Sequence, residues 1–161
     1  MKSLVMAVGL SVAVASFPAP APAQDASVKP AHDAALAGRV GADERGMRRY
    51  VLVILKTGPT RVPEGEERKA MFAGHFANMK RLSDQGKLVL AGPFGEGAGD
   101  WRGLYVFATT DVDEARRLTA TDPVIVKGEM VAEYRSWYGT AAMMLLPELH
   151  EKIAPPPGSG E

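Results

Sequence analysis

The residues with the clearest potential for chemistry are a histidine and an aspartate that lie far apart in the chain. His75 shares a helical stripe with the apolar residues Phe72, Phe76, Met79 and Leu82, so its ring is expected to point inward. An imidazole in that position suits a general acid or base if a partner fixes its tautomer. A core histidine that hydrogen-bonds to the backbone is the alternative interpretation.

Asp122 is the candidate partner of this histidine. It precedes Pro123 at the predicted end of a short helix that opens at Thr110 or Asp111, although an aspartate before proline is also a common turn residue. A carboxylate at the negative end of a helix is unfavourable unless a cation such as an imidazolium compensates it. We therefore expect His75 and Asp122 to meet at an open, partly apolar cavity and to transfer protons there.

Arg102 and Phe94 are the predicted substrate-binding residues. Arg102 follows Trp101 at the start of a strand, where its guanidinium could hold an anionic substrate, and Phe94 lies in the glycine-rich connection before that strand. Arg48 or Arg49 could play the same part. The alternative for all of these arginines is a solvated strand end. The glycine-rich connection is predicted to join two strands, because a phosphate-binding loop requires a helix directly after it.

Other reactive side chains indicate no further chemistry. No two histidines are close in sequence, and His75 has no metal-ligating residue three or four positions away, so no metal or other cofactor is predicted. Ser83 and Ser136 lack the context of a catalytic nucleophile. Glu133 and Arg135 are predicted to form a surface or interface ion pair, and His150 is predicted to be exposed.

The composition excludes several classes of protein. The 161 residues include 19 Lys and Arg against 19 Asp and Glu, and no cysteine. Balanced charge argues against a polybasic nucleic-acid binder, and the lack of cysteine excludes disulfides, thiolate metal sites and cysteine nucleophiles. A hydrophobic share of 46% with 24% charged residues is typical of one globular domain.

The two ends of the chain differ from its middle. Residues 1–23 carry Lys2, an apolar stretch and then prolines, which predicts a secretory signal peptide and a periplasmic or secreted protein with no membrane anchor after cleavage. Residues 24–46 are predicted to be a flexible linker, and the proline-rich residues 154–161 a disordered tail. The folded domain is therefore expected to span residues 47–153.

The order of elements in this domain predicts the fold. Strands are expected at 50–55, 87–92, 101–108 and 130–138, helices at 64–85 and from 110 or 111 to 122, and a broken helix at 141–152. The order β-α-β-β-α-β predicts an α+β, ferredoxin-like fold with both helices on one face of a four-stranded antiparallel sheet. Two of the strands are apolar on both faces, so a second copy is expected to cover the other face and form a homodimer.

An ordered set of short motifs resembles the YCII-related domain family. The set comprises YVLVILKTGP at 50–59, His75 within a helix, LAGPF at 90–94, and Asp122-Pro123 followed by Gly128 and Trp137. The resemblance covers residues 48–138. It implies a dimeric α+β barrel with an active-site pair at His75 and Asp122. Val124 replaces the aromatic residue that the family usually has after Asp-Pro.

Two functions are compatible with these residues. The first is a cofactor-independent isomerase or lyase that acts on a small organic molecule, in which His75 transfers a proton and Asp122 orients it. The second is a non-catalytic dimeric module that binds a small ligand or has a structural role, in which the two residues only satisfy each other's buried polarity.

Overall fold

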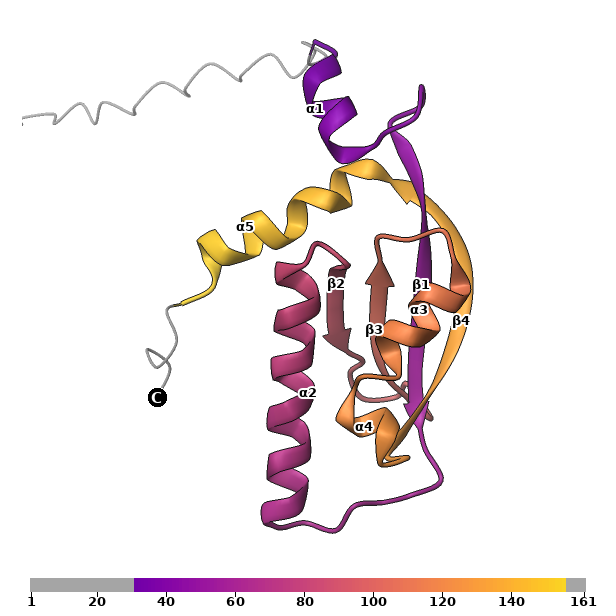
Figure 1. Ribbon diagram of the computed structural model, residues 1–161, viewed down its shortest axis with the longest axis vertical. Coiled ribbons are helices and arrows are strands. Elements are labelled where there is room, and N and C mark those ends of the chain that lie inside the picture. The colour runs from indigo at the N-terminus through magenta and orange to yellow at the C-terminus, as the bar shows by residue number, and fades with distance from the viewer. Residues whose placement is uncertain (1–30, 156–161) are drawn as a thin grey trace, which may run out of the picture. The chain divides into compact units, whose positions relative to one another are not determined.

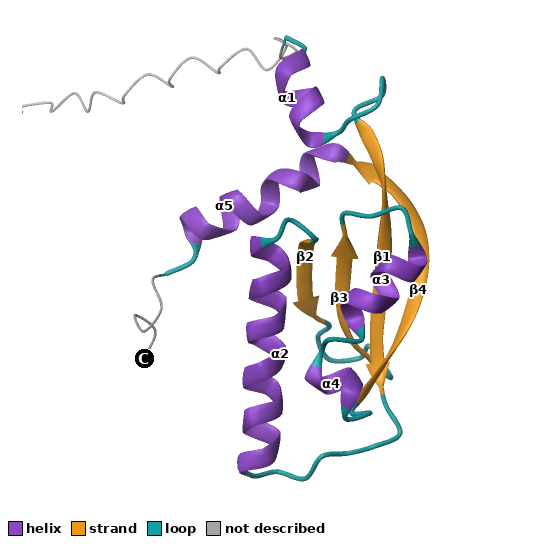
Figure 2. Ribbon diagram, viewed as in Figure 1, coloured by secondary structure: helices purple, strands orange, loops and turns teal. Residues whose placement is uncertain are grey.

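The computed structural model describes residues 31–155, so the predicted signal peptide lies outside the described residues. Four strands form one antiparallel sheet in the order β2-β3-β1-β4. The strands are β1 (Met47–Thr57), β2 (Leu88–Pro93), β3 (Trp101–Phe107) and β4 (Met130–Thr140). Three helices, α2 (Glu66–Asp84), α3 (Val112–Thr119) and α4 (Pro123–Val126), lie on one face of the sheet (Figures 1 and 2). The predicted α+β, ferredoxin-like fold is confirmed.

The main core lies between the sheet and these helices. Strand β1 is central, and its alternate residues Val51, Val53 and Leu55 are buried against the helices. Tyr105 and Phe107 of β3 face the same way, because side chains on a strand alternate between its two faces. Burial of this apolar area holds the helices on the sheet.

The buried stripe of α2 differs from the predicted stripe. It runs through Met71, His75, Asn78 and Leu82, so His75 does point inward as expected. Phe76 was also predicted to face the core, but it is 61% exposed. A residue that follows His75 directly is rotated by about 100° around the helix, which turns it away from the sheet.

The second helical segment is divided into two helices. Helix α3 ends at Thr119, and Asp122 then begins α4 as its N-cap, with its side chain accepting a hydrogen bond from the Val124 N–H at 3.1 Å. The expectation that Asp122-Pro123 only ends a helix is therefore wrong. A carboxylate at an N-cap is favourable, and proline is well suited to the first helical turn.

The other face of the sheet is partly covered by the end of the chain. After β4 come a 3₁₀ helix, η1 (Ala141–Leu145), and α5 (Leu146–Ile153), which contact β2 (Figure 1). Met143 and Met144 pack around the buried side chains of Tyr50, Val89 and Val106. On the remainder of this face the apolar residues Leu90, Val131 and Trp137 are exposed, beside the ion pair of Glu133 and Arg135. The homodimer that was expected to cover this face stays a prediction.

A short helix lies in the segment that was predicted to be a flexible linker. Helix α1 (Ala34–Val40) begins at the N-cap Asp33 and ends at Gly41, whose φ of 66° suits glycine. It contacts η1, and Arg48 of β1 donates to the Val40 carbonyl at 2.9 Å. The ordered structure therefore begins earlier than residue 47. Among the described residues, no helix combines the length and apolar character needed to cross a membrane.

Candidate active site

His75 and Asp122 lie together between α2 and the start of α4. The Nδ1 atom of His75 is 3.0 Å from Oδ1 and 2.9 Å from Oδ2 of Asp122. Asp122 is fully buried and His75 is 8% exposed. The structure thus brings together the two residues that the sequence analysis named, and their catalytic role stays a prediction.

Tyr105 completes the surroundings of the carboxylate. Its hydroxyl donates to Oδ2 of Asp122 at 2.8 Å, while the other oxygen accepts the Val124 N–H. Burial and the charge of Asp122 raise the pKa of Tyr105, which keeps this hydroxyl protonated as a donor. A carboxylate oxygen accepts, so the contact between Nδ1 of His75 and Asp122 is a hydrogen bond when the ring proton lies on Nδ1.

The second ring nitrogen of His75, Nε2, is placed differently from Nδ1. Nε2 has no hydrogen-bond partner among residues 31–155. Within that range, Asn78 Nδ2 is the one side-chain nitrogen or oxygen that is both fully buried and unpaired, so Nε2 reaches the molecular surface. Phe72 and Phe76 flank the ring, with centroids 6.0 Å and 5.4 Å away. The histidine therefore presents Nε2 at an apolar edge.

Gly74 sets the close approach of α2 and α4. A Cβ atom there would lie 3.0 Å from Cγ of Pro123, the residue next to Asp122. We expect Gly74→Val to push α4 away, to reduce the free energy of unfolding by about 1–3 kcal/mol, and to break the contact between His75 and Asp122. Chemical denaturation and the NMR shifts of the His75 ring would measure both effects.

The matched control is the neighbouring residue Ala73, which is exposed on the same helix. Ala73→Val introduces the same side chain but no contact with α4, so the ring shifts should stay unchanged. An equal shift in both variants would contradict the proposed role of the close approach.

Arg102 lies near a second buried carboxylate, that of Glu129. Glu129 Oε1 is 2.8 Å from Arg68, 3.2 Å from Arg61 and 3.9 Å from Arg102. Burial raises the pKa of Glu129, but the Val62 N–H and the nearby arginines outweigh it and hold the pKa below its ordinary value of 4.5. The structure shows no direct contact between Arg102 and His75 or Asp122.

Phe94 is half-buried beside β3. Its N–H donates to the Arg102 carbonyl at 3.1 Å, and its ring lies 5.2 Å from the Trp101 ring. The two predicted substrate-binding residues are therefore neighbours, although Phe94 makes no polar or aromatic contact with His75. Neither Tyr105 nor Glu129 was named from the sequence. A tyrosine on the helix-facing side of a strand was the available signal for Tyr105, because a buried hydroxyl requires a partner.

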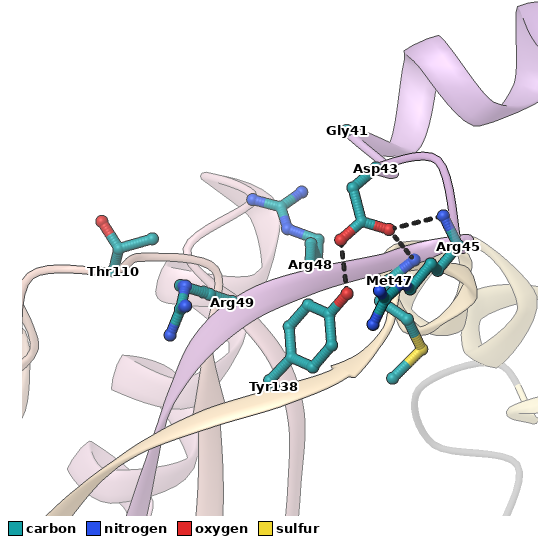
Figure 3. A pocket seen from close by; sticks show the side chains of 8 residues that line it. All are labelled: Gly41, Asp43, Arg45, Met47, Arg48, Arg49, Thr110 and Tyr138. Atoms are coloured by element: carbon teal, nitrogen blue, oxygen red, sulfur yellow. Dashed lines mark hydrogen bonds between the residues drawn. The ribbon is translucent and has the colours of Figure 1, made fainter.

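Arg48 and Arg49 lie elsewhere, at the start of β1. They line a pocket of about 570 Å³ with Arg45, Asp43 and Tyr138 among its other residues (Figure 3). Asp43 accepts from the Tyr138 hydroxyl and from two backbone N–H groups, as Figure 3 shows. Neither this pocket nor a second one on the surface of α2 includes His75 or Asp122, so the expected cavity is not among them.

The remaining predicted residues stay apart from the His75 site. His150 is exposed on α5, as expected, and Arg135 pairs with Glu133 at 3.3 Å on β4. Among residues 31–155, no three His, Cys, Asp or Glu side chains gather as a metal site would require.

Comparison with known proteins assigns the family. The model of the YCII-related domain family matches residues 49–137. The chain is 29% identical over 65 residues to the uncharacterized protein YjpA of Bacillus subtilis, covering 40% of this chain and 73% of YjpA. It is also similar to 5-chloro-2-hydroxyhydroquinone dehydrochlorinase (TftG) of Burkholderia phenoliruptrix, solved with 2,5-dihydroxybenzoquinone. That match has 21% identity and a TM-score of 0.41, covering 54% of this chain and 92% of TftG. Because the family model spans more than half of the chain, the protein belongs to the YCII-related domain family.

Proposed function

We propose that this protein is a cofactor-independent enzyme that transfers a proton on a small organic molecule, in an isomerisation or an elimination. The observation that carries the proposal is the state of the His75 ring. Its Nδ1 is bound by both oxygens of a fully buried aspartate, while Nε2 has no partner among the described residues. A base needs this combination of a fixed tautomer and an accessible nitrogen.

Each of the three polar side chains has a separate role in the proposed reaction. Nε2 of His75 takes a proton from an acidic carbon, and the ring becomes an imidazolium. The Asp122 carboxylate, 2.9 Å away, stabilises the new positive charge, and it cannot reorient because Tyr105 and the Val124 N–H hold its oxygens. Return of the proton to another atom completes an isomerisation, and loss of a leaving group completes an elimination.

Deuterium exchange tests this proposal even when the product of the reaction is not known. The protein is incubated in D₂O with a panel of small carbon acids, such as 1,3-dicarbonyl compounds and hydroxylated aromatic rings, and NMR follows the exchange of C–H for C–D. Exchange that requires His75 supports proton transfer. Absence of protein-dependent exchange across the panel would favour the non-catalytic module.

Export and dimer formation also belong to the proposal. The signal sequence predicts a mature chain that begins at Gln24, and the exposed apolar residues Leu90, Val131 and Trp137 support pairing through the open part of the sheet. Native mass spectrometry of the protein isolated from its own cell envelope measures cleavage before Gln24 and dimer formation in one experiment. The expected mass is twice that of the chain from Gln24. The mass of a single chain that still carries Met1 would contradict both.

A further inference from the structure

The guanidinium of Arg102 is partly buried but has no hydrogen-bond acceptor in the part of the chain that the structure describes. Its side chain is 27% exposed, and the nearest carboxylate oxygen with which it pairs, Oε1 of Glu129, is 3.9 Å away. That distance is too long for a hydrogen bond. The Arg102 side chain makes no hydrogen bond within residues 31–155. Its nitrogens are not among the fully buried unpaired atoms of that range, so they reach the molecular surface. Its donors are therefore available to a ligand.

Glu129 does not need Arg102 to satisfy its own oxygens. Oε1 accepts from Arg68 at 2.8 Å and from Arg61 at 3.2 Å, and Oε2 accepts from the Val62 N–H at 2.8 Å. Arg68 also contacts the exposed carboxylate of Glu64 at 3.1 Å. Three guanidiniums thus face two carboxylates, which leaves one positive charge in excess.

An irregularity in the sheet directs the Arg102 side chain toward the cluster of Glu129, Arg61 and Arg68. Leu55 of β1 pairs with Gly103, and the next residue, Lys56, pairs with Trp101, so Arg102 has no partner of its own. Such a bulge changes the direction of a side chain and is frequent next to functional sites. Without it, Arg102 would face the opposite side of the sheet from Tyr105, because the two residues are three positions apart.

The arginines around Glu129 and the His75 site lie about 10 Å apart along both elements that carry them. Arg102 and Tyr105 are three positions apart on β3, which is about 10 Å along a strand. Arg68 and His75 are seven positions apart on α2, also about 10 Å. Phe72 lies between the two sites. Its ring centroid is 4.9 Å from Cζ of Arg68 and 6.0 Å from the centroid of the His75 ring.

We propose that Arg102 binds the carboxylate of a small organic acid, and that Glu129 is a positioning residue that holds the arginine cluster in place. The planar fork of a guanidinium matches a carboxylate in two parallel hydrogen bonds. The role of this acid as the substrate rests on the proposed function, whereas its binding does not require His75 to be catalytic. The substrate class is therefore a carboxylic acid that also carries a C–H group acidic enough for His75 to deprotonate.

Binding of simple anions tests the proposal. Titration calorimetry would compare benzoate with inorganic phosphate on the full chain, using Arg102→Gln, Arg102→Lys and the control Arg135→Gln, an exposed arginine of β4 that pairs with Glu133. We expect Arg102→Gln to weaken benzoate binding about 10-fold or more. Lysine should restore only part of it, because it lacks the fork, and Arg135→Gln should bind as wild type does.

Three results would overturn the inference: no benzoate binding by the wild type, equal binding by Arg102→Gln, or tighter binding of phosphate than of benzoate. His75→Gln separates the two proposals, because it should keep benzoate affinity even if it abolishes deuterium exchange. Normal exchange in His75→Gln together with lost affinity in Arg102→Gln would refute the proposed function and retain the anion site.

Discussion

His75→Gln is expected to lower the rate of protein-dependent deuterium exchange by about 10²–10⁴, the usual contribution of a positioned acid or base. Glutamine retains a polar group that can reach Asp122 but has no nitrogen that accepts a proton near neutral pH. The ring is 8% exposed and belongs to the inner stripe of α2, so the variant must also be checked for folding by its melting temperature and circular dichroism.

Two further variants sharpen this test. His150→Gln changes an exposed histidine on α5 and should leave the exchange rate unchanged. Asp122→Asn should reduce exchange as well, since a neutral amide no longer stabilises the imidazolium. A folded His75→Gln protein that exchanges at the wild-type rate would remove His75 from the reaction.

Glu129→Gln is expected to reduce the free energy of unfolding by about 3–5 kcal/mol, because it removes the partner of a buried charge. The Glu129 side chain is completely buried, and the Arg68 side chain, which is 10% exposed, would lose its closest carboxylate. Urea denaturation measures the change. Glu133→Gln on β4 is the matched control, and it should cost at most about 1 kcal/mol because its ion pairs are partly exposed.

The carboxylate of Glu129 is also expected to make the free energy of unfolding depend on pH. The pKa of Glu129 in the folded protein lies below its ordinary value of 4.5. Its stabilising contribution is therefore complete above pH 4.5 and is lost as the pH falls through the lower, folded value. The difference in stability between wild type and Glu129→Gln should shrink with acidification in that range. A constant difference from neutral pH to well below 4.5 would contradict the ionised state of Glu129.

The pairing of His75 with Asp122 was predictable because each residue carried a local signal. Periodicity placed His75 on the inner stripe of its helix, and the ferredoxin-like order of elements brought the second helical segment beside the first. The reason given for Asp122 was nevertheless wrong. It begins α4 instead of ending α3, a distinction set by a hydrogen bond to the Val124 N–H that Asp-Pro alone does not predict.

Other features depend on long-range geometry that a sequence does not display. Glu129 precedes β4 and reads as an ordinary surface carboxylate, and only the fold brings Arg61 and Arg68 to it. The bulge at Arg102 depends on the register of two strands more than 40 residues apart. Helix α1 lies in a segment without apolar periodicity, where the cap at Asp33 was the available signal.

The protonation of the His75 ring is the most direct test of the whole account. Long-range ¹H–¹⁵N NMR of the histidine-labelled protein distinguishes the two tautomers of the neutral ring. We expect the proton on Nδ1, donated to Asp122, with an unprotonated Nε2 whose signal responds to added carbon acids. A neutral ring with its proton on Nε2, or an Nε2 signal that no small molecule perturbs, would show that this histidine cannot act as the base.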